Sequence, residues 1–136
     1  MSHTVIESFY VGIVGSDGRK FDKLSEKKAR DRISQIIAYE IISHPHMNIV
    51  IVSGHCHLGG IDIFAEEIAN KFEISMIPYP PNNLRWEPDG FKARNMRIAQ
   101  KSDILYVLSN DDWNGGMWTG NYAKKLGKTV KFMDLR

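Results

Sequence analysis

The sequence predicts an α/β fold, a three-layer sandwich in which about five mostly parallel strands are flanked by about four helices. Two observations lead to this prediction. Short apolar runs alternate with segments of helical periodicity along the whole chain. Central runs such as residues 49–52 and 104–108 are apolar at successive positions, which is typical of parallel strands covered on both faces. A chain of 136 residues, of which 43% are hydrophobic, is expected to form a single domain over residues 1–136.

The expected elements follow this pattern in chain order. Strands are expected at residues 10–15, 49–52, 74–79, 104–108 and 129–133. Helices are expected at residues 24–43, 61–72, 91–101 and 117–126. Ser25 is the expected N-cap of the first helix, which ends before Pro45, and Glu66 and Glu67 are expected on a solvated face of the second helix. Residues 80–90 form an irregular stretch that is long enough to predict a lid or a binding loop.

The composition narrows the cellular context and the partners. The net charge of +2 is nearly balanced, so it provides no strong field for a nucleic acid or an anionic membrane. The single cysteine, Cys56, excludes an internal disulfide and fits a reducing compartment. Residues 1–4 are not expected to begin a leader peptide, and no run approaches the roughly 18 apolar residues of a membrane helix. We therefore expect a cytoplasmic protein without a membrane partner.

Three polar loops follow strands, so they are expected to meet at the edge of the sheet where open parallel sheets bind ligands. The loops span residues 15–19, 54–60 and 109–116. Gly59-Gly60 and Gly115-Gly116 each come directly before a helix, where unpaired N–H groups and the helix dipole favour an anion such as a phosphate. Glycines that only form tight turns are the alternative for either loop taken singly.

Several motifs stand in a characteristic order: Gly15-Ser-Asp, the run from Val52 to Ala65, Arg94-Asn95, and Gly115-Gly-Met-Trp-Thr119. They resemble the motifs of the Rossmann-like superfamily often called SLOG, which includes the DNA-processing protein A domains, the lonely-guy phosphoribohydrolases and small stand-alone nucleotide-binding proteins. The likeness runs from Tyr10 to Phe132, and Trp86 ahead of the Arg-Asn pair fits the stand-alone branch best. The resemblance implies a Rossmann-like domain that binds a nucleotide or a nucleotide derivative across the three loops.

The last motif departs from the phosphoribohydrolase pattern. That family has Pro-Gly-Gly-x-Gly-Thr-x-x-Glu, and its glutamate helps to cleave the N-glycosidic bond. Here Trp118 stands at the third glycine, and Asn121 and Tyr122 stand where carboxylates are expected. An amide cannot exchange a proton as a carboxylate does, so these positions do not favour hydrolysis. If the chain does cleave a glycosidic bond, Asp111 or Asp112 would have to replace the glutamate.

The candidate site combines glycines, short polar residues, histidines and the Arg-Asn pair. The expected ligand-binding residues are Gly15, Ser16, Ser53, Gly54, His55, His57, Gly59, Gly60, Asp62, Arg94, Asn95, Gly115, Gly116 and Thr119. Trp86, Trp113 and Trp118 lie in or beside the loops and are the candidates for stacking on a base. For Asp62, stabilisation of a helix start is an equal alternative to the ribose contact that the resemblance implies.

His55, Cys56 and His57 include side chains that can ligate a metal or act as a nucleophile and its base. No second closely spaced pair of ligands occurs in the chain, so neither a metal nor another cofactor is expected, although a metal held by His55 and His57 stays an alternative. Cys56 is expected to be a small packing residue. A histidine that binds a phosphate or ribose hydroxyl and one that satisfies loop carbonyls are equally expected.

These observations predict a nucleotide-binding sensor or carrier, whose ligand is a nucleotide or a phosphoribosyl or ADP-ribose-like derivative. A nucleotide hydrolase that cleaves an N-glycosidic or phosphate bond is the alternative. Binding of single-stranded nucleic acid is a weaker alternative, because it needs a basic groove that the net charge does not predict. A homodimer through residues 24–43 and 117–126 is a further expectation that the resemblance implies.

Overall fold

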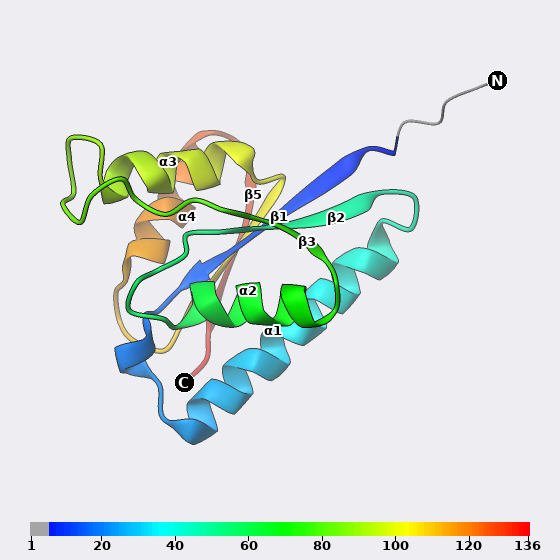
Figure 1. Cartoon of the computed structure of the whole chain (residues 1–136), viewed down its shortest axis with the longest axis horizontal. Helices are drawn as coiled ribbons and strands as arrows, with labels where there is room; N and C mark the ends of the chain where they lie inside the picture. The colour runs from blue at the N-terminus through cyan, green and yellow to red at the C-terminus, as the bar shows by residue number, and fades with distance from the viewer. Residues whose placement is uncertain (1–5) are drawn as a thin grey trace.

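The computed structural model describes residues 6–136 as one sheet with helices on both faces (Figure 1). The strands are β1 (Ser8–Gly15), β2 (Asn48–Ser53), β3 (Ser75–Pro78), β4 (Ile104–Ser109) and β5 (Thr129–Asp134). The helices are α1 (Lys23–Ser43), α2 (Ile61–Lys71), α3 (Phe91–Lys101) and α4 (Gly115–Lys125), with a short 3-10 helix η1 (Gly18–Lys20) after β1. Residues 1–4, on which the expectation of no leader peptide rests, lie outside the described residues. Within residues 6–136, no helix has the length and apolar character needed to cross a bilayer.

All neighbouring strands pair in parallel, in the order β3-β2-β1-β4-β5. Helices α1 and α2 cover one face of the sheet and α3 and α4 cover the other (Figure 1), which confirms the predicted three-layer α/β fold. Each pair of helices covers its own cluster of buried apolar side chains. The strand order reverses at β1, so the carboxyl ends of β1, β2 and β4 lie side by side, where such sheets bind ligands.

Capping side chains move the starts of two helices away from their predicted positions. Asp22 is the N-cap of α1: its carboxylate accepts from the Ser25 N–H at 2.8 Å, and its own N–H donates to Ser25 Oγ at 2.9 Å. The prediction that Ser25 is the cap was therefore wrong, because Ser25 is the third helical residue of a capping box. Helix α4 begins at Gly115 rather than Met117, because the Asn114 side chain accepts from the Met117 N–H at 3.2 Å.

A buried carboxyl group joins α1 to the sheet. Glu40 is 2% exposed and accepts a hydrogen bond of 2.5 Å from the hydroxyl of Tyr106 on β4. His44 Nδ1 lies 3.4 Å from the second carboxyl oxygen of Glu40, and Phe9 stacks on the His44 ring. Burial, together with the bond to Glu40, raises the pKa of the Tyr106 phenol above its usual range. Tyr106 is therefore protonated at neutral pH and donates its hydroxyl proton to Glu40.

Replacing Tyr106 by phenylalanine is expected to destabilise the chain by about 2 kcal/mol, because Glu40 stays buried and loses its hydroxyl donor. The volume of the side chain is nearly conserved, so packing contributes little. Chemical denaturation measures the effect. Tyr39→Phe is the control: Tyr39 is 57% exposed, so the expected change is below about 0.5 kcal/mol. Equal effects of the two substitutions would mean that the contact with Glu40 adds no stability.

Candidate functional site

A cavity of about 450 Å³ opens at the carboxyl ends of β1, β2 and β4, which is enough room for a small-molecule ligand. The predicted site residues that line it are Gly15, His57, Asp62, Trp86, Arg94, Asn95, Asp111, Trp113, Gly115, Gly116 and Thr119. The predicted residues that do not line it are Ser16, Ser53, Gly54, His55, Gly59, Gly60, Asp112 and Trp118. The three loops therefore meet around one space, and they present part of the predicted set to it.

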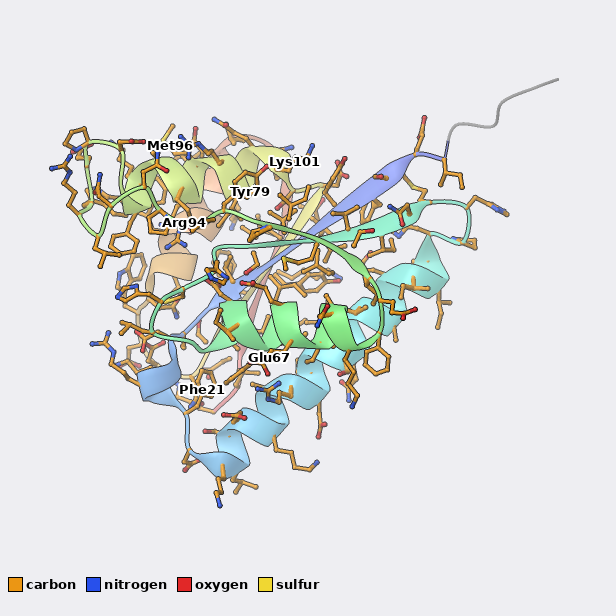
Figure 2. All side chains as sticks on the ribbon, viewed as in Figure 1. Phe21, Glu67, Tyr79, Arg94, Met96 and Lys101 are labelled. Atoms are coloured by element: carbon orange, nitrogen blue, oxygen red, sulfur yellow. The ribbon has the colours of Figure 1, made fainter. Side chains whose placement is uncertain are left out.

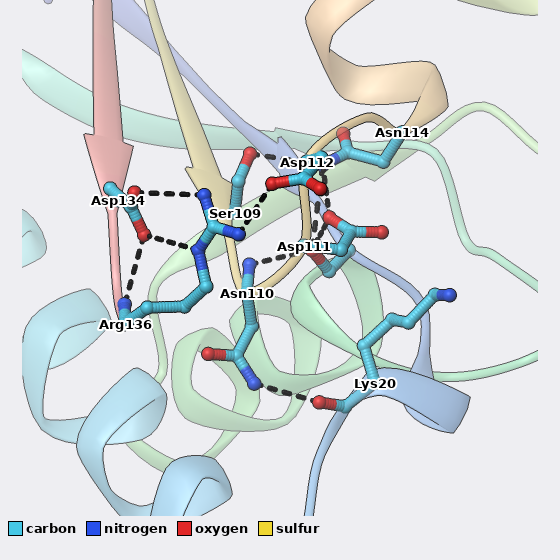
Figure 3. Close-up of polar contacts among 9 residues, drawn as sticks. Lys20, Ser109, Asn110, Asp111, Asp112, Asn114, Asp134 and Arg136 are labelled. Atoms are coloured by element: carbon cyan, nitrogen blue, oxygen red, sulfur yellow. Dashed lines mark hydrogen bonds and ion pairs between the residues drawn. The ribbon is translucent and has the colours of Figure 1, made fainter.

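Ser16 joins these loops beneath the cavity. It is fully buried, and its Oγ donates to Asp111 Oδ1 at 2.6 Å and accepts from the Asn110 N–H at 2.8 Å. Its carbonyl oxygen accepts from the Ile61 N–H at 3.0 Å, at the start of α2. Asn114 Nδ2 also donates to Asp111 Oδ1, at 2.9 Å (Figure 3). Ser16, which directly follows β1, thus holds both the loop before α4 and the start of α2.

The first turn of α4 contributes backbone to the cavity wall. Gly115 and Gly116 follow the N-cap Asn114, and Gly115 is exposed. The partial positive charge of the helix start favours an anion there. Thr119 does not offer its hydroxyl proton to a ligand at this turn, because its Oγ1 already donates to the Gly115 carbonyl at 3.1 Å.

Two cations that sequence reasoning missed come from η1. Arg19 and Lys20 both line the cavity, directly after the turn that ends β1. Arg19 binds both carboxylate oxygens of Asp17, at 3.0 and 2.9 Å, and this pairing lowers the pKa of Asp17. Lys20 has no acidic partner within 4.0 Å among residues 6–136, so its charge is available to a ligand. The signal in the sequence was a basic pair immediately after a Gly-Ser-Asp-Gly turn at a strand end.

Arg94 is on α3, and its side chain reaches toward the ends of β2 and β3 (Figure 2). Its guanidinium donates to the Gly54 carbonyl and to Asn95 Oδ1, the latter at 2.8 Å, and it lies 3.5 Å from the Tyr79 carbonyl. A side chain at Gly54 would place its Cβ 2.7 Å from both Arg94 Nη1 and Asp62 Oδ2. Gly54 therefore allows this cation and this carboxylate to face one another across the loop. The Nε and Nη1 groups of Arg94 are therefore bound by the protein itself.

Burial shifts the pKa values of the groups around Arg94. Burial raises the pKa of Asp62 to about 6, against the opposing effect of the Arg94 charge. Burial also lowers the pKa of the Arg94 guanidinium and raises that of the Cys56 thiol. Cys56 is thus a neutral thiol at neutral pH, which disfavours its alternative role as a nucleophile. The pKa of Asp62 therefore lies close to the physiological range.

His55 pairs with Glu66 outside the cavity wall. Its Nδ1 lies 2.8 Å from Glu66 Oε1, and the buried Ser53 donates its Oγ proton to Glu66 Oε2 at 2.9 Å. The Glu66 side chain is only 12% exposed, so the prediction of a solvated face is wrong for this residue. It holds for Glu67, which is 56% exposed and meets Arg30 of α1 at 3.1 Å. Helical periodicity places Glu66 at the margin of the buried face, where Ser53 and His55 provide its partners.

The two glycines before α2 hold loops together instead of lining the cavity. Gly60 is the N-cap of α2 with φ +82°, and a Cβ there would lie 2.3 Å from the Ser16 carbonyl oxygen. The Gly59 N–H donates to the Cys56 carbonyl at 3.0 Å, and the Ile61 N–H donates to Ser16. These two N–H groups are therefore used inside the protein.

The three tryptophans occupy different places. Trp86 lines the cavity from the irregular stretch 80–90, and its ring meets Trp118 edge to face at 5.0 Å. Trp118 stacks on Tyr122 of the same helix at 5.4 Å, so it supports Trp86 from outside the cavity. Trp113 lines the cavity from the loop before α4 and is 60% exposed. Two of the three candidates thus face the cavity.

The two carboxylates considered for hydrolysis diverge. Asp111 lines the cavity, and its bonds from Ser16 and Asn114 both go to Oδ1, which leaves Oδ2 for a ligand. The Asp112 side chain is 94% exposed and binds Arg136 at 2.6 Å, which Asp134 also holds (Figure 3). Across residues 6–136, no group of three or more His, Cys, Asp or Glu side chains is arranged to hold a metal ion.

No protein-family model and no curated protein sequence matches the chain. Among solved structures, the chain is similar to the molybdenum cofactor binding protein from the phototrophic bacterium Rippkaea orientalis, with a TM-score of 0.66 and 20% sequence identity. The match covers 96% of this chain and 78% of that one. At this level of identity, the similarity shows that the two chains share the same α/β fold.

Proposed function

We propose that the chain binds a nucleotide or nucleotide-derived small molecule, as a sensor or carrier, in the cavity at the carboxyl ends of β1, β2 and β4. The observation that carries the proposal is the composition of the cavity wall, where the start of α4, Lys20 and two tryptophans face one space. A phosphate group suits the helix start and the cation, and an aromatic base suits the indoles. One ligand class therefore satisfies all three features. The similar solved structure, which is a cofactor-binding protein, supports ligand binding in general.

Catalysis is not part of this proposal. Glycosidases as a rule use two carboxylates on either side of the bond that breaks. Of the two candidates, Asp111 lines the cavity, whereas Asp112 is outside it and bound to Arg136. Asp62 lies in the cavity wall beside Arg94, with Gly54 between them, and Arg94 donates a hydrogen bond to the Gly54 carbonyl. The geometry therefore favours holding a ligand over cleaving it.

Thermal unfolding with AMP, ADP, cyclic AMP and ADP-ribose tests the proposal, with inorganic phosphate for comparison. At least one nucleotide is expected to raise Tm by several degrees, because a ligand at 100 times its Kd stabilises the folded state by about 2.7 kcal/mol. Chromatography of the same mixtures detects any free base. If no nucleotide raises Tm more than phosphate does, the proposal fails. If chromatography shows steady release of the free base, the chain is a nucleotide hydrolase and not a sensor or carrier.

A charge variant links that result to the cavity. Lys20→Ala is expected to weaken the best nucleotide about tenfold, because a charge-assisted contact with a phosphate is lost. Lys125→Ala removes an exposed lysine from the far end of α4 and is the matched control. Equal weakening by the two substitutions would indicate a general charge effect and contradict binding beside Lys20.

A further inference from the structure

Trp113 is a large apolar ring that the fold leaves uncovered at the mouth of the cavity. It is 60% exposed, and no aromatic ring among the described residues stacks on it or meets its edge. Trp86, the other indole in the wall, packs against Trp118 at 5.0 Å. Leaving an indole in water forgoes a considerable gain from burial. Exposure alone does not single out Trp113, since Phe72 is 59% exposed as well, but Trp113 also lines the cavity, where a bound ligand would cover it.

The surroundings of Trp113 define the chemistry of that ligand. Asp111, two residues earlier, is held by Ser16 and Asn114 through Oδ1 and keeps Oδ2 as a free acceptor. Lys20 lies in the same cavity wall. A protein-docking surface would be a contiguous apolar patch, whereas the cavity wall that holds this ring also carries the charged side chains of Asp111 and Lys20. A flat ring with polar substituents fits both the indole face and the acceptor.

We propose that Trp113 is the platform on which the base of a nucleotide stacks, so that the cavity selects nucleotides over sugar phosphates that lack a base. This inference rests on the proposed function and names its ligand class more narrowly. Trp86, supported by Trp118, forms a second aromatic wall of the cavity. Stacking tolerates different bases, since every base presents an aromatic face. The base is thus held by the ring, and the phosphate by the start of α4 and Lys20.

Isothermal titration calorimetry with ribose 5-phosphate and with the tightest of AMP, GMP, CMP and UMP tests this inference. Stacking of one base on an aromatic ring changes affinity by roughly 5- to 150-fold. Wild-type chain is therefore expected to bind the nucleotide at least about tenfold more tightly than ribose 5-phosphate. Trp113→Ala should lose about tenfold for the nucleotide and leave ribose 5-phosphate within about twofold, whereas Trp113→Phe should retain most of the affinity.

Phe72→Ala is the matched control, because Phe72 is 59% exposed at the end of α2 and does not line the cavity. It should leave both affinities unchanged. Circular dichroism and Tm establish that each variant is folded. If Trp113→Ala weakens both ligands equally, or neither, the stacking role is wrong and nucleotide binding still stands. If wild-type chain binds neither ligand and no nucleotide of the thermal-unfolding panel raises Tm more than phosphate does, the proposed function fails and this inference fails with it.

Discussion

Gly60→Ala is expected to destabilise the chain by about 4 kcal/mol, whereas Gly127→Ala should cost only about 1 kcal/mol. The two glycines have nearly the same φ, +82° and +81°. A positive φ costs an alanine about 1–2 kcal/mol at Gly127, and about 1–3 kcal/mol at Gly60, whose ψ of −149° lies in a region that almost only glycine adopts. At Gly60 the new Cβ would also lie 2.3 Å from the Ser16 carbonyl oxygen and 2.4 Å from Asp17 C, whereas at Gly127 nothing lies within 4 Å. The difference between the two variants therefore combines the backbone strain at Gly60 with the close packing of the loops after β1 and β2.

Urea denaturation of the wild type and the two variants provides the comparison. The atoms that the Gly60 methyl group would meet are backbone atoms, which cannot rotate away as a flexible side chain would. The strain must therefore be relieved by moving the start of α2 or the turn after β1. Two similar losses of about 1 kcal/mol would mean that the loops move easily. The turn after β1 and the start of α2 would then not be rigidly packed against each other.

Asp62→Asn is expected to stabilise the chain by about 2 kcal/mol at pH 7 and by almost nothing at pH 3.5. The pKa of Asp62 is raised from 3.8 to about 6 in the folded chain, mainly by burial. Between these two values, the folded chain binds more protons than the unfolded chain. The free energy of unfolding therefore falls as pH rises through this window, at up to about 1.4 kcal/mol per pH unit. An asparagine does not titrate in this range, so the substitution removes the fall in the free energy of unfolding.

The measurement is the free energy of unfolding of wild type and variant at half-unit steps from pH 3.5 to 7.5. The informative quantity is the difference between the two curves, because other carboxylates contribute to both. Asp112→Asn, which removes a carboxylate that is 94% exposed, controls for the loss of one negative charge. Parallel curves for wild type and Asp62→Asn would show that Arg94 and the loop backbone compensate fully for the burial of Asp62.

Sequence reasoning predicted the layers and the edge of the sheet at which the cavity opens, because both depend on local patterns. The predicted bounds of α3, residues 91–101, coincide with the observed helix, since Gly90 precedes its periodic face and Ser102 follows it. The rule that loops after parallel strands share one edge placed all three loops around the cavity. The N-caps of α1 and α4, Asp22 and Asn114, were missed because a cap depends on which side-chain oxygen reaches a backbone N–H.

The inner surface of the site was less predictable, because contacts between distant residues decide it. The bond from Ser16 to Asp111 spans 95 positions, and Glu66 is drawn inward by Ser53 and His55, which periodicity alone does not reveal. Arg94 was expected to bind a ligand, and its Nε and Nη1 groups are found to donate to Asn95 and Gly54. The ligand roles of the residues in the wall remain predictions that the titrations above can decide.

The position of Ser16 has a consequence for the entropy of binding. Its side chain and its carbonyl together fix the loop before α4 and the start of α2, so the backbone around the cavity is already ordered before a ligand arrives. A preorganised backbone removes the cost of ordering loops at the moment of association. What a ligand still has to immobilise is a few side chains at the mouth, chiefly the indole of Trp113 and the long chain of Lys20.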